Sequence, residues 1–580
     1  MKQNVFNLNT LKAHPERNAF DLSHNDVFSC APGQLLPISV IEVLPNEHYQ
    51  IKPDIFLRTM PLNSAAYVRL RQHIEFFFVP MRTLCRQFNQ FVVGTKYPIS
   101  NIDALNSFTG SLPTTKLGDL VALCYDNQWN EDHRDGLSIS NNLNHKRLYD
   151  LLGYGINSVN VPMSFKDYTA FDSWDTSVSL LRLAAYQKIY SDFYRNPYYE
   201  SVDTSSFNLD DIFGQYLAAS TPTSIYRLLR LSTLRYRNWK LDYFTSVQPS
   251  FQGAPFVTRG VDMSQFNLNQ IDDGFDIVAS TGQFGPNDPS TSRGASLKND
   301  SDTVNNELLG RFNIPVHNIR AAFALDKLLR LQQQAGNGSY GEQIRNRFGF
   351  GGVHDDWKAT FIGGTSAPVS ISEVITTANT TDAGDSSYLG QTGDIYGKAV
   401  SSTDPNSPFI EFDTKEHGII MGIFSVAPEA DYNSFCLDRH NMKLRFEDFF
   451  QPEFERLGKQ PLSSYELTTT KPQGFTTWTN RVIGFQNRYL EYKTKVDKVH
   501  GQFCSGGTLS AWSAPRNSGV INDTDSPFNL YSLKVSPKIL NSICSVAFNG
   551  NEGTDPILVD SHIMIKAIRP ISVSSEPLLN

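Results

Sequence analysis

The sequence has few of the features that mark a redox, metal-binding or disulfide-stabilised protein. Only six of its 580 residues are cysteine, and no two of them have C-x-x-C spacing. A disulfide scaffold would be much denser in cysteine. We therefore expect these cysteines to be reduced and mostly buried, as in a reducing cytoplasm.

Long apolar runs are also lacking. The first residues, MKQNVFNLNTLKAHPERNAFDLS, contain neither an apolar core nor a small-residue cleavage site, so they do not predict a signal peptide. The most apolar stretches, such as HIEFFFVPM and GIIMGIFSVA, are shorter than the roughly 18 residues that a membrane helix needs. The sequence therefore predicts a soluble protein that is made in the cytoplasm.

Charged residues are scarce, at 19%, and the formal net charge is -8. A dedicated polyanion-binding protein is usually basic overall, so this balance disfavours one, although it allows a local basic patch. Aromatic residues, by contrast, reach 12%, with 39 Phe and 24 Tyr. Disordered chains are poor in aromatic residues, so we expect this chain to fold.

Motifs for catalysis, cofactors or metals are absent or fit a structural interpretation better. GxSxG, HExxH and Walker A patterns do not occur, so we predict neither an enzyme nor a cofactor. GNGSYG (336–341) matches GxGxxG but follows an expected helix instead of a strand, which favours a helix stop and a turn. HDD (354–356) and NDTD (522–525) lack further ligands at metal spacing, and we interpret both as solvated turns.

Strand patterns lie at both ends of the chain, with helix patterns and polar loops between them. Residues 1–33 suggest an extended arm, and 34–94 and 409–580 carry most of the strand signals. Long insertions are expected over 95–408, with helices near 180–196, 319–334 and 340–348. Strands and helices do not alternate regularly, which disfavours a doubly wound parallel sheet. The pattern predicts a mainly β protein, an antiparallel sheet or barrel with enlarged connections.

The clearest strand lies in YVRLRQHIEFFFVPMRTL (67–84). Alternate positions carry its apolar residues, which predicts one buried face of a strand: Val68, Leu70, Ile74, Phe76 and Phe78. Phe77 makes the end of the strand apolar on both faces. Pro80 has no N–H to donate and should end the ladder.

The opposite face of this strand carries Arg69, Arg71 and His73. One interpretation is a solvated face, which is normal for antiparallel sheets. The other is a surface for phosphate groups or for a neighbouring subunit. The residues alone leave both interpretations open.

The stretch LLRLAAYQKIYSDFYRNPYYE (180–200) predicts a helix. One stripe of it carries Leu183, Tyr186, Tyr190 and Phe193, beside a second apolar stripe, so we expect the helix to be buried. The tyrosines that follow, Tyr198 and Tyr199, are suited to stacking on bases, but core packing or a protein contact is favoured.

In order along the chain, these segments resemble the major capsid protein of the microviruses, the small icosahedral single-stranded DNA phages, and especially its gokushovirus-like branch. The matching blocks are FDLS (20–23), GQLLPISVIEVLPNE, RTMPL, FFFVPMRTL, RLAAYQKIYSDFYRNP, IRAAFALDKLLRLQQQAGNGSYGEQIRNRFG, WKATFIGGTSAPVSI, EHGIIMGIFSVAP, RFEDFFQPEFERLGKQPL, IGFQNRYLEYK and IRPISVSSEP. The helix block resembles the family motif RAYxxIxNxxFRD, on which lie Arg182, Tyr186, Tyr190, Phe193 and Arg195. The insertion around 95–170 and the loops at 201–306 and 365–408 match no part of the family pattern.

The resemblance implies an eight-stranded antiparallel jelly-roll β-barrel with large helix- and loop-containing insertions. It implies a structural subunit of a T=1 icosahedral shell around circular single-stranded DNA, without catalytic, metal or cofactor sites. In that fold, Phe76, Phe77, Phe78 and Pro80 would anchor a barrel strand. Arg69, Arg71 and His73 would face a neighbouring subunit, the genome or solvent.

The resemblance also implies partners and a location. The expected partners are further copies of the chain, the packaged DNA, a small basic DNA-binding peptide, a pilot or minor capsid protein, and a host receptor for the exterior loops, but no membrane. The expected location is the virion, after assembly in the host cytoplasm.

Two other functions stay in play. Loops rich in Tyr and Asn suit stacking on sugars, so a carbohydrate-binding β-rich surface protein is the alternative, which the missing signal peptide disfavours. A β-rich hydrolase is disfavoured because no nucleophile or acid–base motif is present.

Overall fold

The computed structural model describes the following residues: 17–93, 112–124, 141–156, 175–217, 221–249, 357–375, 380–381, 388–390, 395–404, 407–455, 458–469, 480, 482–516, 533–550 and 552–573. All of them belong to the larger of two units of the chain, Met1–Pro249 with Asp355–Asn580. The helices expected at 319–334 and 340–348 and the motifs at 336–341, 354–356 and 522–525 lie outside the described residues.

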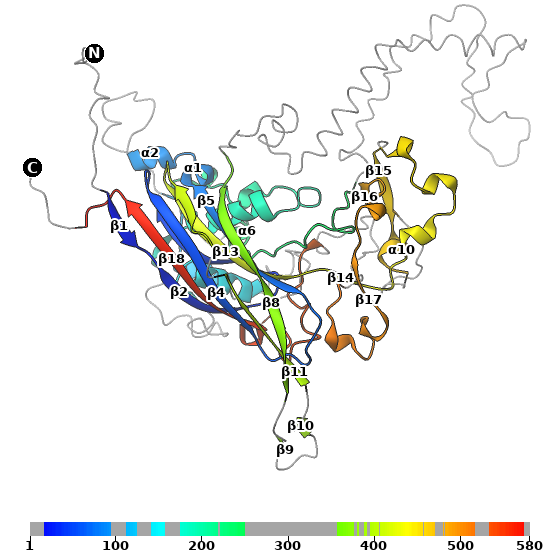
Figure 1. Cartoon of the computed structure of the whole chain (residues 1–580). Coiled ribbons are helices and arrows are strands. Elements are labelled where there is room, and N and C mark those ends of the chain that lie inside the picture. Colours follow the sequence, from blue (N-terminus) through cyan, green and yellow to red (C-terminus); the bar gives the residue numbers. More distant parts are fainter. Residues whose placement is uncertain are drawn as a thin grey trace, which may run out of the picture. The chain divides into compact units, whose positions relative to one another are not determined.

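A ten-stranded antiparallel sheet dominates the described part of the chain (Figure 1). Its order is β1-β18-β4-β11-β8-β5-β13-β3, and in addition β2 pairs with β18 and β12 with β4. The strands are β1 (Asn18–Asp21), β2 (His24–Cys30), β3 (Leu36–Val43), β4 (His48–Thr59), β5 (Leu70–Pro80), β8 (Thr360–Ile375), β11 (Ile395–Ser402), β12 (Ile410–Asp413), β13 (Gly418–Pro428) and β18 (Ile557–Arg569). The expectation of a mainly β, antiparallel fold is confirmed.

The ten strands occupy eight positions across the sheet. β1 and β2 follow one another along the same edge of β18, pairing with its last and first residues respectively. In the same way β11 and β12 pair with opposite ends of β4. The sheet therefore also takes strands from residues 18–30 and 360–402, which the sequence pattern had assigned to the arm and the insertions. Neither segment has a strong apolar alternation, because β1 and much of β8 are exposed on one or both faces.

Alternation along the strands explains where the core lies. In β4 every second residue from Tyr49 to Thr59 is buried, and in β18 the same holds from Ile557 to Ala567. Each strand therefore has one buried face and one face towards solvent. β13 is buried along both faces. The sequence GIIMGIFSVAP is apolar at almost every position for this reason.

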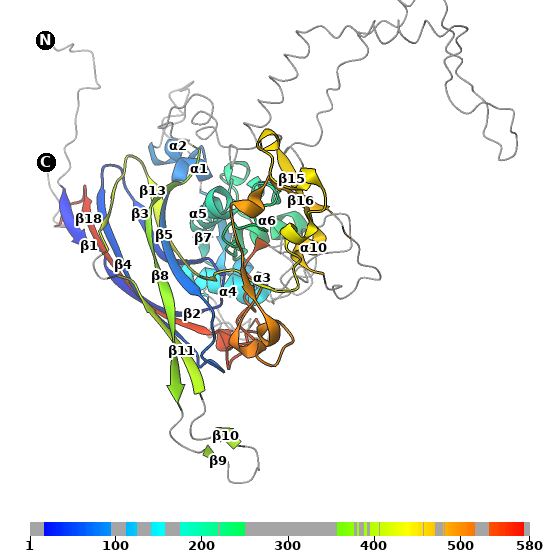
Figure 2. The ribbon, with the colours of Figure 1, turned by 45° about the vertical axis from the view of Figure 1, so that its right-hand side comes forward.

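The sheet curls on itself. The ring of Phe28 on β2 packs edge-on against Phe424 on β13, with centroids 5.6 Å apart, although these strands belong to opposite ends of the sheet. At the other rim, the Arg569 guanidinium on β18 donates to the carbonyl oxygen of Glu42 on β3 at 2.9 Å. The result is a half-barrel whose apolar inner face forms the core (Figure 2).

Helices cover the face of β3, β13 and β5 that points away from the inside of the half-barrel (Figure 2). The α-helices are α1 (Met81–Leu84), α2 (Phe88–Val93), α3 (Leu117–Leu123), α4 (Asn141–Leu151), α5 (Leu181–Ile189), α6 (Pro222–Ser232) and α10 (Ser464–Leu467). α5 contacts both β5 and β13, and α4 contacts β3. All but one of the residues of α5 are buried, so it is a core helix instead of a surface one.

Smaller paired elements lie outside the large sheet. The short ladders are β6 (Thr114–Lys116) with β7 (Ser177–Ser179), β9 (Thr380–Thr381) with β10 (Tyr388–Gly390), β14 (Asp431–Asn433) with β17 (Asp497–Val499), and β15 (Lys459–Ser463) with β16 (Val482–Asn487). Figure 1 shows β8 and β11 running beyond the sheet as a hairpin with β9 and β10 near its tip. All six cysteines are buried and free, as expected.

Candidate functional site

The polar face of β5 is held by partners from the same chain. Arg69, just before the strand, donates to Asp431 at 2.7 Å and to Asp497 at 2.6 Å, and these aspartates begin β14 and β17. Glu429 lies 3.4 Å from the same guanidinium and 4.0 Å from Arg71. Burial raises the pKa of the Asp431 carboxyl even though Arg69 opposes this effect. The cluster ties the large sheet to the β14–β17 pair.

Further along the same face, Glu75 is clamped under the helical layer. Both of its oxygens accept from the Arg237 guanidinium at 3.1 Å, and one also accepts from the Tyr194 hydroxyl. His73 is half-buried beside this pair. Burial, followed by the nearby charge of Arg237, lowers the pKa of His73 to about 4, so the ring is neutral at pH 7.

The structure therefore places the polar residues of β5 in two different settings. The Arg69 side chain remains 49% exposed and Arg71 42%, whereas His73 turns towards Arg237 and Glu75. A role of Arg69, Arg71 and His73 in contacting a subunit or DNA stays a prediction. Phe76, Phe78 and Pro80 are buried on the other face, Phe77 is buried on the same face as Glu75, and the strand ends at Pro80.

The residues of the family-motif helix bind to the segment before β3 and to other parts of the helical layer. The Tyr186 hydroxyl donates to the Leu35 carbonyl at 2.9 Å, and the Tyr190 hydroxyl donates to Glu200 at 2.6 Å. Arg182 reaches the Leu152 carbonyl at 3.1 Å, and Arg195 reaches that of Glu200 at 2.6 Å. These contacts give the motif a structural role within the folded chain.

Phe193 departs from the regular helical stripe expected from the sequence. A π-helical turn, Tyr190–Tyr194, follows α5 and changes the spacing of side chains by one residue. Phe193 is consequently 40% exposed, and its ring packs on Phe77 with centroids 4.7 Å apart. Tyr199, further along, donates to the Val247 carbonyl at 2.9 Å, which agrees with packing inside the protein.

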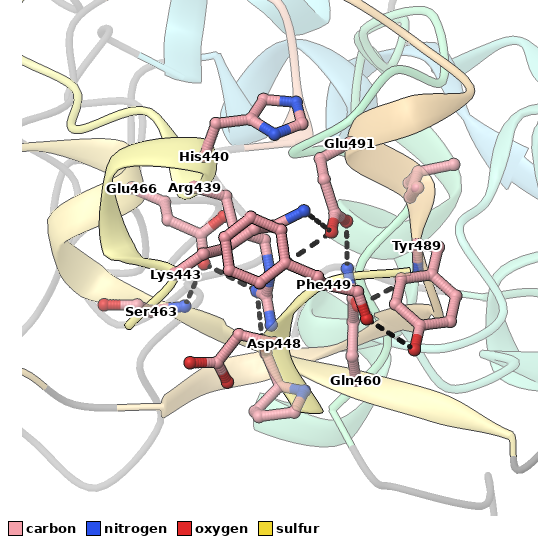
Figure 3. A network of polar contacts seen from close by, with 12 residues as sticks. Arg439, His440, Lys443, Asp448, Phe449, Gln460, Ser463, Glu466, Tyr489 and Glu491 are labelled. Carbon is pink, nitrogen blue, oxygen red and sulfur yellow. Dashed lines mark hydrogen bonds and ion pairs between the residues drawn. The ribbon is translucent and has the colours of Figure 1, made fainter. Parts of the chain in front are cut away.

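A second polar network joins the segment 438–455 to the β15–β16 hairpin (Figure 3). Arg439 donates to Glu466 at 2.9 Å, and Lys443 pairs with Glu491 at 3.1 Å. Burial raises the pKa of Glu466. Burial also pushes the pKa of Glu491 upwards, but bonds from Gln460 and Lys443 bring it below its usual value. Each glutamate has a cation and a neutral donor from its own chain, so the network acts as a structural clasp.

This clasp supports an exposed apolar segment, residues 444–450, with the sequence LRFEDFF. The Asp448 carboxylate accepts from the backbone N–H groups of Arg445 and Leu444, which closes a tight turn and lowers the pKa of Asp448. Leu444 is 87% exposed and Phe446 73%, and Phe449 and Phe450 are also exposed. An anchored segment that shows four large apolar side chains is typical of a protein–protein contact.

The apolar segment and its clasp were not singled out from the sequence as a site. The three phenylalanines lie among charged residues without a helical or strand period, and this combination is the signal that such a site offers. Among the described residues, no group of three or more His, Cys, Asp or Glu side chains is placed to hold a metal ion. No helix in the described part of the chain is long and apolar enough to cross a membrane.

Comparison with known proteins identifies relatives of the whole chain. Capsid protein VP1 of Chlamydia phage 1 is 23% identical over an alignment 640 residues long, gaps included. The alignment covers 97% of this chain and 95% of that protein. Capsid protein VP1 of Bdellovibrio phage phiMH2K is 21% identical over 528 residues, covering 86% of this chain and 85% of that protein. The resemblance to gokushovirus-like capsid proteins is thus confirmed.

A family model described as "Capsid protein (F protein)" matches residues 9–125 and 162–551. The match includes β5, the family-motif helix and the apolar segment 444–450. A capsid protein is a structural component of the virion, and its copies associate with one another to form the capsid. We conclude that the chain belongs to the F capsid protein family.

Proposed function

We propose that this chain is the major capsid protein of a microvirus and that its copies assemble into a T=1 icosahedral shell around circular single-stranded DNA. The observation that carries the proposal is the family match over most of the chain, together with relatives aligned over nearly their whole length. The jelly-roll architecture belongs to the same proposal. Eight strand positions and a sheet whose opposite ends meet across the core at Phe28 and Phe424 support it.

The surface of the subunit supports association with other copies. Interfaces between subunits need apolar anchors that are fully covered on assembly. The segment 444–450 offers such anchors on a rigid base, and the exposed arginines of the β5 face offer charges for a rim.

We include in the proposal the packaged DNA, a small basic DNA-binding peptide and a pilot or minor capsid protein as partners, exterior loops as receptor contacts, and assembly in the host cytoplasm. The net charge of -8 favours a separate basic peptide for neutralising the genome.

Electron microscopy and sedimentation of the chain, expressed alone and together with its neighbouring phage proteins, test the proposal. Closed, uniform particles that protect single-stranded DNA from nuclease are expected. A chain that stays monomeric with those phage proteins supplied and binds a glycan would overturn it.

A further inference from the structure

A cavity of about 540 Å³ lies outside the surfaces described so far. It is bordered by Trp239, by residues 505–516 and by residues 534–542. Arg516, Lys534 and Lys538 line it together with five serines, and its described lining contains no carboxylate. The cavity is therefore positive and rich in hydrogen-bond donors, although the chain as a whole is acidic.

Lys534 is the most informative residue of the cavity. It is only 4% exposed, and its ammonium lies 5.7 Å from the ring centroid of Tyr190. Among the described residues it forms no ion pair and no hydrogen bond through its side chain. A nearly buried lysine without an anion costs free energy, whereas the similarly buried Arg147 has the carboxylate of Asp555 beside it. An anionic ligand in the cavity would supply the missing partner.

The rest of the cavity wall is held in place. The Arg516 guanidinium lies over the Trp239 ring, 5.4 Å from its centroid, and donates to the Tyr432 hydroxyl at 3.0 Å. Lys534 itself pairs with Asn238 through a β-bridge, next to Trp239 in sequence. The cations and the indole are therefore positioned before any ligand arrives, which lowers the entropic cost of binding.

We propose that this cavity binds a phosphodiester group of single-stranded DNA, with Lys534 as its main cation. Ammonium, guanidinium and serine hydroxyl groups are the donors that proteins direct at phosphate oxygens. The volume exceeds what one phosphate needs and leaves space for the attached nucleoside. This inference rests on the proposed function, because packaged DNA is what would bring such a ligand to the subunit.

The test uses the purified full chain and a fluorescein-labelled oligothymidylate, followed by anisotropy at several salt concentrations. Lys534→Met keeps the aliphatic stem and removes the charge. We expect its affinity to fall about tenfold, as for loss of a charged hydrogen bond, and the slope of log K against log salt to fall by ~0.7. Lys566→Met, on the exposed side of β18, removes the same charge elsewhere and should change neither quantity. Equal affinities for the two variants would overturn the proposal.

Thermal unfolding separates a ligand site from a structural lysine. Without DNA, Lys534→Met should unfold no lower than the wild type, because it removes an uncompensated buried charge. If that variant does not fold, Lys538→Met takes its place, since Lys538 is exposed and lines the same cavity; weaker oligonucleotide binding is again expected, and unchanged binding would overturn the proposal.

Competition identifies the ligand class. Inorganic phosphate should displace the oligonucleotide only at high concentration. Oligoglutamate that binds through Lys534, with oligonucleotide affinity unaffected by Lys534→Met, would assign the cavity to an acidic peptide and overturn the DNA proposal. Normal particles from Lys534→Met with unchanged DNA affinity would overturn this inference and leave the proposed function intact. A wild-type chain that stays monomeric with its neighbouring phage proteins supplied, and binds a glycan, would overturn the proposed function itself.

Discussion

At the scale of single residues, alternation along β5 was predictable but the surroundings of its polar face were not. Period-two burial of Leu70, Ile74 and Phe76 follows from the sequence pattern alone. The partners of Glu75, however, come from Tyr194 and Arg237, more than a hundred residues away. No local pattern specifies which cation meets which carboxylate over such a separation. From the sequence, the polar face of β5 could therefore be interpreted either as a solvated surface or as an interface.

The first prediction concerns His73 and pH. Its pKa is lowered to about 4 by burial and by Arg237, whereas an unfolded histidine titrates near about 6.5. Between these values the unfolded state binds a proton that the folded state does not, so the free energy of unfolding should fall as the pH falls from about 7 to about 4. At ~1.4 kcal/mol per pKa unit, His73 contributes at most about 3.5 kcal/mol to this loss.

Urea unfolding of the isolated subunit across this pH range measures the effect. His73→Gln should flatten the pH dependence, and the exposed His500→Gln should leave it as in the wild type. The buried His145, whose pKa burial also lowers, should contribute a residual slope to every variant. Identical pH profiles for His73→Gln and the wild type would contradict the prediction.

The second prediction concerns a buried ion pair. Arg147 on α4 pairs with Asp555, and both side chains are almost completely buried. Asp555→Asn leaves the guanidinium without its counter-charge, so we expect a loss of about 3–5 kcal/mol in the free energy of unfolding. The matched control is Asp175→Asn, which breaks the exposed pair with Lys116 and should change stability very little. Equal stability of the two variants in urea titrations would contradict this expectation.

At the scale of secondary-structure elements, strong apolar patterns predicted the structure and weak ones did not. β13 and β18 were recognisable because their buried positions carry Ile, Val, Met and Phe. β8 and β11 were not, because Ser, Thr and Gly fill much of the hairpin and the last residues of β8, 372–375, are exposed on both faces. Backbone pairing to β5 and β4, instead of side-chain hydrophobicity, places this hairpin in the sheet.

The third prediction concerns a close approach between strands. At Gly418, the start of β13, an added Cβ would collide with the ring of Phe78 and lie 2.7 Å from the carbonyl oxygen of Val79. Gly418→Ala should therefore cost about 1–3 kcal/mol through displacement of β5. Gly553→Ala, where a Cβ meets open space, should stay within about 0.5 kcal/mol of the wild type. Thermal unfolding of both variants decides, and a neutral Gly418→Ala would show that the strands can separate freely.

At the scale of the whole molecule, family membership was predictable from the sequence because many short blocks occur in order. All of the apolar segment 444–450 except Leu444 lay inside one of those blocks, yet its exposure could not be predicted. Exposure depends on the clasp of Arg439, Lys443, Glu466 and Glu491, which only the folded subunit brings together. The cavity around Lys534 could not be predicted from the sequence either, because its cations come from segments without a basic cluster.

The fourth prediction follows from that exposure. Phe446→Asp should leave the unfolding temperature of the subunit nearly unchanged, because the side chain is largely in water. In an assembled shell, the same change would bury an unpaired charge against a neighbour, so we expect loss of particles in sedimentation and electron microscopy. Phe446→Leu keeps the apolar surface and should still assemble. Normal particles from Phe446→Asp would exclude segment 444–450 from the subunit interface.

The position of β18 has a consequence for how a subunit is made. This strand, residues 557–569, lies between β4 on one side and β1 and β2 on the other, so strands from residues 18–59 dock on a strand that is synthesised much later. Within the described sheet, β1 and β2 pair only with β18, and β18 is the partner of β4 on that side, so these edges stay unpaired until residues 557–569 have left the ribosome. Nascent chains must therefore wait with unpaired strand edges, and pairings so distant in sequence close slowly. The half-barrel is completed only after β18 has been synthesised, so a chain that stops before residue 557 lacks the strand that joins β1 and β2 to β4.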